Sequence, residues 1–130
     1  MITDRDIAVL AAIQRYYVLN RPQIQRLCFT DHSSGRATRR RLQELVGAGF
    51  LNRLRLVVHH PLAGSPGPVY YPARRGLEFL AEHTDDERLL ATSTQPPQSH
   101  QVFHWLAVAE THIALDRAIA LQDRVELRGW

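Results

Sequence analysis

The amino-acid sequence predicts an α+β fold that is mostly helical and ends in a long helix. Three observations lead to this prediction. Helix-capping residues followed by apolar residues at helical spacing occur repeatedly within the first 50 residues. Apolar residues then occur at every second position within residues 50–58, which is the spacing of a strand. A loop rich in proline and glycine separates this segment from a short returning segment at 69–72. Helical spacing resumes after a polar stretch that contains two prolines.

Capping residues mark the start of the first two helices. Thr3 and Asp6 have the spacing of a capping box, and apolar residues follow at helical spacing over 4–18. Asn20 restarts the pattern with Gln23 three positions later, which predicts a second and shorter helix.

The third predicted helix, residues 36–48, is the most basic element of the chain. It follows turn-forming residues at 30–35 and ends at two glycines. With successive residues placed at 100° intervals, the side expected to face the core holds Thr38, Leu42, Leu45 and Gly49. The opposite side holds Ser33, Arg36, Arg40, Gln43 and Gly47. Arg39 and Arg41 lie on the two flanks.

A hairpin and a fourth helix complete the first unit, residues 1–83. Its strands are expected within 50–58 and 69–72, and the helix ends near His83. Residues 84–99 are polar and contain prolines, which predicts a linker. A helix over about 100–121 follows, and residues 125–130 are compatible with a strand.

The order of helix, helix, helix, hairpin and helix is that of a winged helix-turn-helix domain. We therefore expect the third helix to enter the major groove of double-stranded DNA. Base edges would be contacted by Arg36, Arg40 and Gln43, and phosphates by Arg39 and Arg41. Further phosphate contacts are expected from Ser33, Ser34, Arg53, Arg55, Arg74 and Arg75. The alternative is that this run of arginines is only a solvated helix face.

The charge of the chain is unevenly distributed. Residues 1–80 contain twelve arginines and five acidic residues, whereas residues 81–130 contain four arginines and eight acidic residues. Because phosphate repels acidic surfaces, we expect the second part to face away from DNA. Its helix would join two copies of the chain into a homodimer through residues 100–121. The alternative is that this helix folds back onto its own domain and the protein is monomeric. The expected interface residues are Leu106, Ala109 and Ile113.

Several classes of function are not expected. Cys28 is the only cysteine, and His100 and His104 have no third convergent ligand, so we expect neither a disulfide nor a metal site. The sequence has no Gly-rich phosphate loop and no nucleophile elbow, and we expect no cofactor and no enzyme activity. It shows neither an export signal nor an apolar run of membrane-spanning length, which predicts a cytoplasmic protein.

Five segments carry a resemblance to a known family. They are TDRDIAVL at 3–10, PQIQRLCF at 22–29, ATRRRLQELVGAGFL at 37–51, VYYPARRG at 69–76 and HWLAVAE at 104–110. Together they resemble the replication-relaxation proteins of bacterial plasmids and mobile elements. The first four segments are shared with many winged-helix regulators, whereas the last favours this family. The resemblance implies sequence-specific DNA binding in plasmid replication or relaxation, or in transcriptional regulation.

Two other functions stay open. The basic face would be incidental in a winged helix that binds other proteins. The chain would alternatively be the N-terminal part of a DNA-processing, nuclease-like enzyme, because the resemblance implies that family members continue beyond the position of Trp130 into a longer acidic domain.

Overall fold

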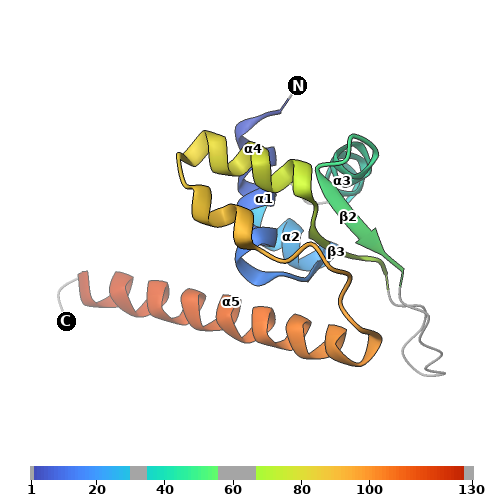
Figure 1. Ribbon diagram of the computed structural model, residues 1–130. Coiled ribbons are helices and arrows are strands. Elements are labelled where there is room, and N and C mark those ends of the chain that lie inside the picture. The colour runs from blue at the N-terminus through green and yellow to red at the C-terminus, as the bar shows by residue number, and fades with distance from the viewer. Residues whose placement is uncertain (1, 30–34, 56–66, 128–130) are drawn as a thin grey trace.

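The computed structural model describes residues 2–29, 35–55 and 67–127, and the side chains up to residue 122 (Figure 1). It confirms the α+β, mostly helical class. The elements are α1 (Asp4–Tyr16), β1 (Leu19–Asn20), α2 (Arg21–Cys28), α3 (Arg36–Gly47), β2 (Leu51–Leu54), β3 (Val69–Pro72), α4 (Arg74–Thr84), the 3₁₀-helix η1 (Glu87–Ala91) and α5 (Ser99–Leu127). The three strands form one antiparallel sheet in the order β1-β3-β2, which is consistent with a winged helix.

Both predicted helix caps are present. The Thr3 hydroxyl accepts a hydrogen bond from the Asp6 amide at 3.2 Å, and the Asp6 carboxylate accepts one from the Thr3 amide at 2.8 Å. Asn20 and Gln23 form the same reciprocal pair at the start of α2. These bonds satisfy amides that a helix leaves without partners in its first turn. Helix α1 ends before the predicted residue 18, because Tyr17 adopts a positive φ of 70°.

The sheet contains a strand that the sequence patterns did not predict. In β1, Leu19 pairs with Tyr70, and this contact places β3 in the centre of the sheet with all four of its residues buried. On the other side of β3, Leu51 of β2 pairs with Pro72. Strand β2 ends at Leu54, and residues 56–66 of the expected hairpin lie outside the described residues.

Helix α3 turns its predicted apolar side to the core. Thr38, Leu42 and Leu45 are buried, as its helical spacing predicts. Gly49 does not face the core as expected: it is exposed, and it closes the helix in a turn with a φ of 84°. A residue with a side chain rarely adopts this φ, so the backbone conformation and not packing requires a glycine here.

Helix α5 belongs to the same core as the rest of the chain. Ala109 packs in the main apolar cluster with residues of α1, and Val102 packs against Val18 and Val69. Figure 1 shows α5 as one straight helix beside α1 and α2. Its 29 residues give it a length of about 43 Å, and it includes residues 125–127, for which the sequence was compatible with a strand. The expected linker, residues 84–99, contains η1.

The packing of α5 shows that two of the expected dimer-interface residues are buried within a single chain. Ala109 is fully buried and Ile113 is 4% exposed within a single chain, so neither side chain is available to a partner. Leu106 is half-buried. Up to residue 122, the large apolar side chains that α5 exposes are Phe103, Val108, Leu115, Ile119 and Leu121. In the described part of the chain, no helix has the length and apolar character needed to span a membrane.

Candidate nucleic-acid interface

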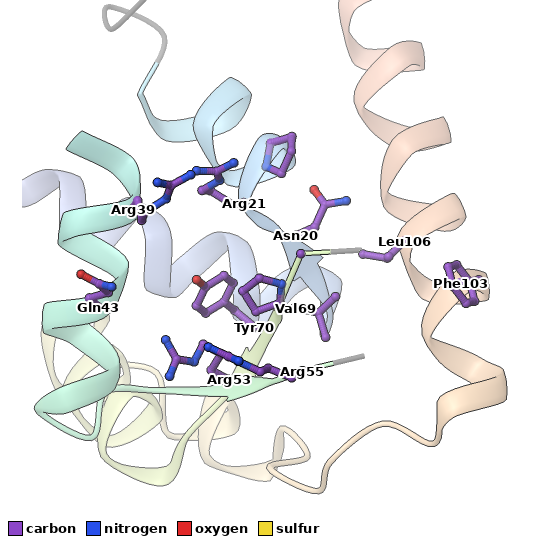
Figure 2. Close-up of a pocket in the computed structure, with 13 residues that line it drawn as sticks. Asn20, Arg21, Arg39, Gln43, Arg53, Arg55, Val69, Tyr70, Phe103 and Leu106 are labelled. Carbon is purple, nitrogen blue, oxygen red and sulfur yellow. The ribbon is translucent and has the colours of Figure 1, made fainter. Parts of the chain in front are cut away.

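A cavity of about 640 Å³ opens between α3, β2 and α5 (Figure 2). Strand β3 and the start of α2 also contribute to its lining. One wall carries positive charge and the other, which comes from α5, is apolar. The cavity therefore lies between the basic elements of the first 80 residues and the C-terminal helix.

Four of the predicted site residues meet in this cavity. Arg39 and Gln43 come from α3, Arg53 comes from β2, and Arg55 follows the end of that strand. All four side chains are exposed. No carboxylate lines the cavity, and within the described part of the chain none of its arginines forms an ion pair. Unneutralised guanidinium groups at this density favour an anionic ligand.

Arg36 and Arg40 lie on the same exposed side of α3 but outside the cavity lining. The Arg40 side chain is 82% exposed, and its Nε lies 3.4 Å from the Glu44 carboxylate. An exposed pair at this distance contributes little to stability, so the Arg40 guanidinium is available to another anion.

Arg41 has a structural contact in place of the expected surface position. Its guanidinium donates hydrogen bonds to Asp6 and Glu44, and Asp6 is fully buried. Burial alone would raise the pKa of Asp6, but hydrogen bonds from Arg41 and Thr3 outweigh it and lower the pKa. Arg41 thus joins α3 to the start of α1.

Arg74 and Arg75 lie away from the cavity lining. Arg74 Nε donates to Glu78 at 2.9 Å along the first turns of α4. Arg75 Nη1 donates to the Ala48 carbonyl at 2.6 Å, and its guanidinium lies 4.6 Å from the centre of the Phe50 ring. Arg75 therefore holds the turn between α3 and β2. Ser33 and Ser34 lie outside the described residues.

Arg21 and Tyr70 are among the cavity residues that were not predicted from the sequence as site residues, and so is Phe103 of α5. Arg21 begins α2 and reaches the start of α3 beside Gly35. Tyr70 is 3% exposed, and burial raises its pKa, although Arg53, Arg21 and Arg39 partly offset this. Both residues reach the cavity through the pairing of β1 with β3. A strand of two residues gives no periodic signal, so the sequence offered no means of placing them.

Contacts between α5 and α2 fix the apolar wall. Glu110 accepts hydrogen bonds from Arg26 at 2.7 and 2.5 Å and from Gln23 at 3.0 Å. The Gln23 amide also donates to the Leu106 carbonyl at 3.0 Å. The bonds from Arg26 and then Gln23 lower the pKa of Glu110 to about 2. Phe103 and Leu106 are thereby held across the cavity from the arginines.

Other candidate chemistry is sparse in the described residues. They contain no group of three or more His, Cys, Asp or Glu side chains placed to hold a metal ion. His104 packs edge-on against the neighbouring Trp105. Burial raises the pKa of Cys28 to about 11, which keeps its sulfur in the unreactive thiol form at neutral pH.

Comparison with known proteins identifies the family. The family model described as replication-relaxation matches residues 10–130, which is the resemblance that the sequence segments predict. Neither the curated proteins nor the solved structures include a match. Since the matched range covers nearly the whole chain, this protein belongs to the replication-relaxation family.

Proposed function

We propose that this protein binds double-stranded DNA through α3 and β2, and that it serves plasmid replication or relaxation as a sequence-specific binding protein and not as an enzyme. The observation that carries the proposal is the meeting of Arg39, Gln43, Arg53 and Arg55 in one cavity that no carboxylate lines. Family membership supports the replication role.

The exposed side of α3 has the residue types that read base edges. Arg36, Arg40 and Gln43 point away from the buried Leu42 and Leu45, so the helix can enter a groove without disturbing the core. Arginine and glutamine side chains form paired hydrogen bonds with guanine and adenine edges in the major groove. We assign sequence preference to these three residues.

The arginines beside α3 are suited to the DNA backbone. Arg39 lies on the flank of the helix, and Arg53 of β2 and Arg55 just after it line the same cavity. Contacts to phosphate carry no sequence information but set orientation and most of the affinity. Acidic residues follow α4 at its end away from α3, at Asp85 and Asp86 (Figure 1). The proposed binding surface is therefore free of this repulsive charge.

Selection of duplexes from a random library tests the proposal, followed by fluorescence anisotropy on the selected site. Arg40→Ala should lose about 1 to 3 kcal/mol of binding free energy at that site and relax base preference. Arg88→Ala is the charge-matched control, because Arg88 is 91% exposed on η1 and pairs with Asp86. It should bind as the wild type does.

Two outcomes would contradict this assignment. One is a selection that enriches no sequence, which would leave the basic face without a reading function. The other is an Arg88→Ala variant that binds as weakly as Arg40→Ala, which would mean that overall charge and not α3 determines binding.

A further inference from the structure

The Tyr70 hydroxyl lies at the floor of the cavity and has no hydrogen-bond partner among the described residues. Tyr70 is almost completely buried, yet within the described part of the chain its hydroxyl forms no hydrogen bond. Figure 2 shows this hydroxyl pointing toward α3, with Arg21 and Arg39 on one side and Arg53 on the other. The hydroxyl is not one of the buried polar atoms that lack a partner, so it is accessible from the cavity. A donor that lies among three arginines at such an opening matches a phosphate oxygen.

The opposite wall offers an aromatic ring. Phe103 of α5 is 51% exposed and lines the cavity together with Leu106. Phe103 has no ring partner in the described residues. A positively charged groove with an exposed aromatic side chain is typical of sites that hold unpaired nucleotides, because any base can stack on the ring.

We propose that the cavity binds an unpaired nucleotide of single-stranded DNA, with the phosphate on Arg21, Arg39, Arg53 and the Tyr70 hydroxyl, and the base against Phe103. The inference rests on the proposed function, since it assigns a second ligand form to arginines that also contact duplex DNA. A volume of about 640 Å³ is within the range of small-ligand sites.

A paired base does not reach such a site. Bases within a duplex are stacked and hydrogen-bonded, and a protein contacts the flat face of one only after it leaves the helix. Duplex binding through the exposed side of α3 therefore does not need Phe103, whereas strand binding does. This difference separates the two ligands experimentally.

Anisotropy with a labelled twelve-nucleotide oligothymidylate and with the matching duplex tests the inference. Phe103→Ala should weaken strand binding roughly tenfold, as loss of one stacked base does, and change duplex binding less than about twofold. Phe103→Trp should retain strand binding, because indole also stacks. Leu121→Ala is the matched control, since Leu121 is 62% exposed on α5 and does not line the cavity. It should bind both ligands normally.

Tyr70→Phe gives an independent measurement. It removes only the hydroxyl, and it should weaken strand binding severalfold without lowering the melting temperature, because the hydroxyl has no partner in the described fold.

Free thymidine monophosphate should displace the strand only at concentrations far above that of the oligonucleotide. Displacement at equal concentration would overturn the assignment to a strand.

The outcomes distinguish this inference from the proposed function. If Phe103→Ala weakens both ligands equally or neither, the nucleotide site is wrong whatever the duplex affinity. If the wild type binds the strand in a Phe103-dependent manner but shows no duplex binding, the proposed function fails and the nucleotide site stands. If duplexes are bound and the strand is not, only the nucleotide site fails.

Discussion

Glu110 on α5 and Arg26 on α2 form a two-point ion pair, with Arg26 Nη1 2.7 Å from Oε1 and Nη2 2.5 Å from Oε2. The Gln23 amide donates to the same carboxylate. Because Gln23 also caps α2 and bonds to the α5 backbone, these contacts place Phe103 opposite the arginines of α3 and β2. The pair between helices thus determines the shape of the candidate site.

Removing the Glu110 charge should make stability depend less on pH. The pKa of Glu110 is about 2 in the folded chain against an ordinary 4.5, so the pair stabilises the fold fully above about pH 4.5 and is lost as the pH falls toward 2. Both side chains are partly exposed, which limits the contribution to about 1 kcal/mol. Glu110→Gln should therefore be less stable at pH 7 and nearly equal to the wild type near pH 2.

Urea unfolding at several pH values measures this difference. Glu82→Gln is a suitable control, because Glu82 is exposed on α4 and forms no ion pair with another described residue. A Glu110→Gln deficit that stays constant between pH 7 and pH 2 would contradict the assigned ion pair.

Two adjacent arginines of α3 should have opposite phenotypes. Arg41→Ala leaves the buried Asp6 carboxylate without its main partner and should lower the free energy of unfolding by about 3 kcal/mol. Arg40→Ala removes an exposed side chain and should change it by less than about 0.5 kcal/mol. Thermal and urea unfolding of both variants measure the difference. Equal stabilities would show that the Asp6 contact does not support the fold.

Gly76 should be intolerant of any side chain. A Cβ atom at this position would lie 2.1 Å from the Phe50 carbonyl oxygen, which belongs to the backbone between α3 and β2. Gly76→Ala should therefore destabilise the protein by at least about 2 kcal/mol. Gly47→Ala is the control, since a Cβ atom at Gly47 would meet no neighbouring atom within 4 Å and helix propensity favours alanine. It should leave the melting temperature unchanged or raise it.

The homodimer stays a prediction, with a different surface from the one expected. Val108, Leu115 and Ile119 form an exposed stripe about 100–120° around α5 from the buried Val102 and Ala109. The charged residues of α5 up to position 122, Glu110, Asp116 and Arg117, lie outside this stripe. An uncharged stripe on a charged chain favours a second copy of the same helix, because identical surfaces then meet without repulsion.

Sedimentation velocity measures this association at micromolar concentrations. The wild type should sediment as a dimer, and Leu115→Asp combined with Ile119→Asp should sediment as a monomer with unchanged circular dichroism. A monomeric wild type would contradict the prediction.

The sequence was informative where local chemistry decides structure. The capping pairs at Thr3 and Asn20 and the buried side of α3 follow from hydrogen bonding and helical spacing within a few residues. Periodicity shows that a face is buried but not what covers it. The apolar residues of α5 therefore suggested a dimer, although Ala109 and Ile113 pack within their own chain.

In the candidate site too, local patterns were predicted and long-range contacts were not. Arg39, Gln43, Arg53 and Arg55 were identified because their elements are recognisable in the sequence. The contact of Arg41 with Asp6 was not predicted, since Asp6 is 35 residues away in the chain and no local pattern joins them. Such long-range pairs depend on tertiary packing.

The salt dependence of DNA binding tests the central claim most directly. Arg53→Ala should weaken binding to all duplex sequences alike and should lower the slope of log K against log salt concentration by about one unit, as loss of one phosphate contact does. Arg88→Ala should keep the wild-type slope. An unchanged slope in Arg53→Ala, or an equal reduction in Arg88→Ala, would contradict a DNA interface formed by α3 and β2.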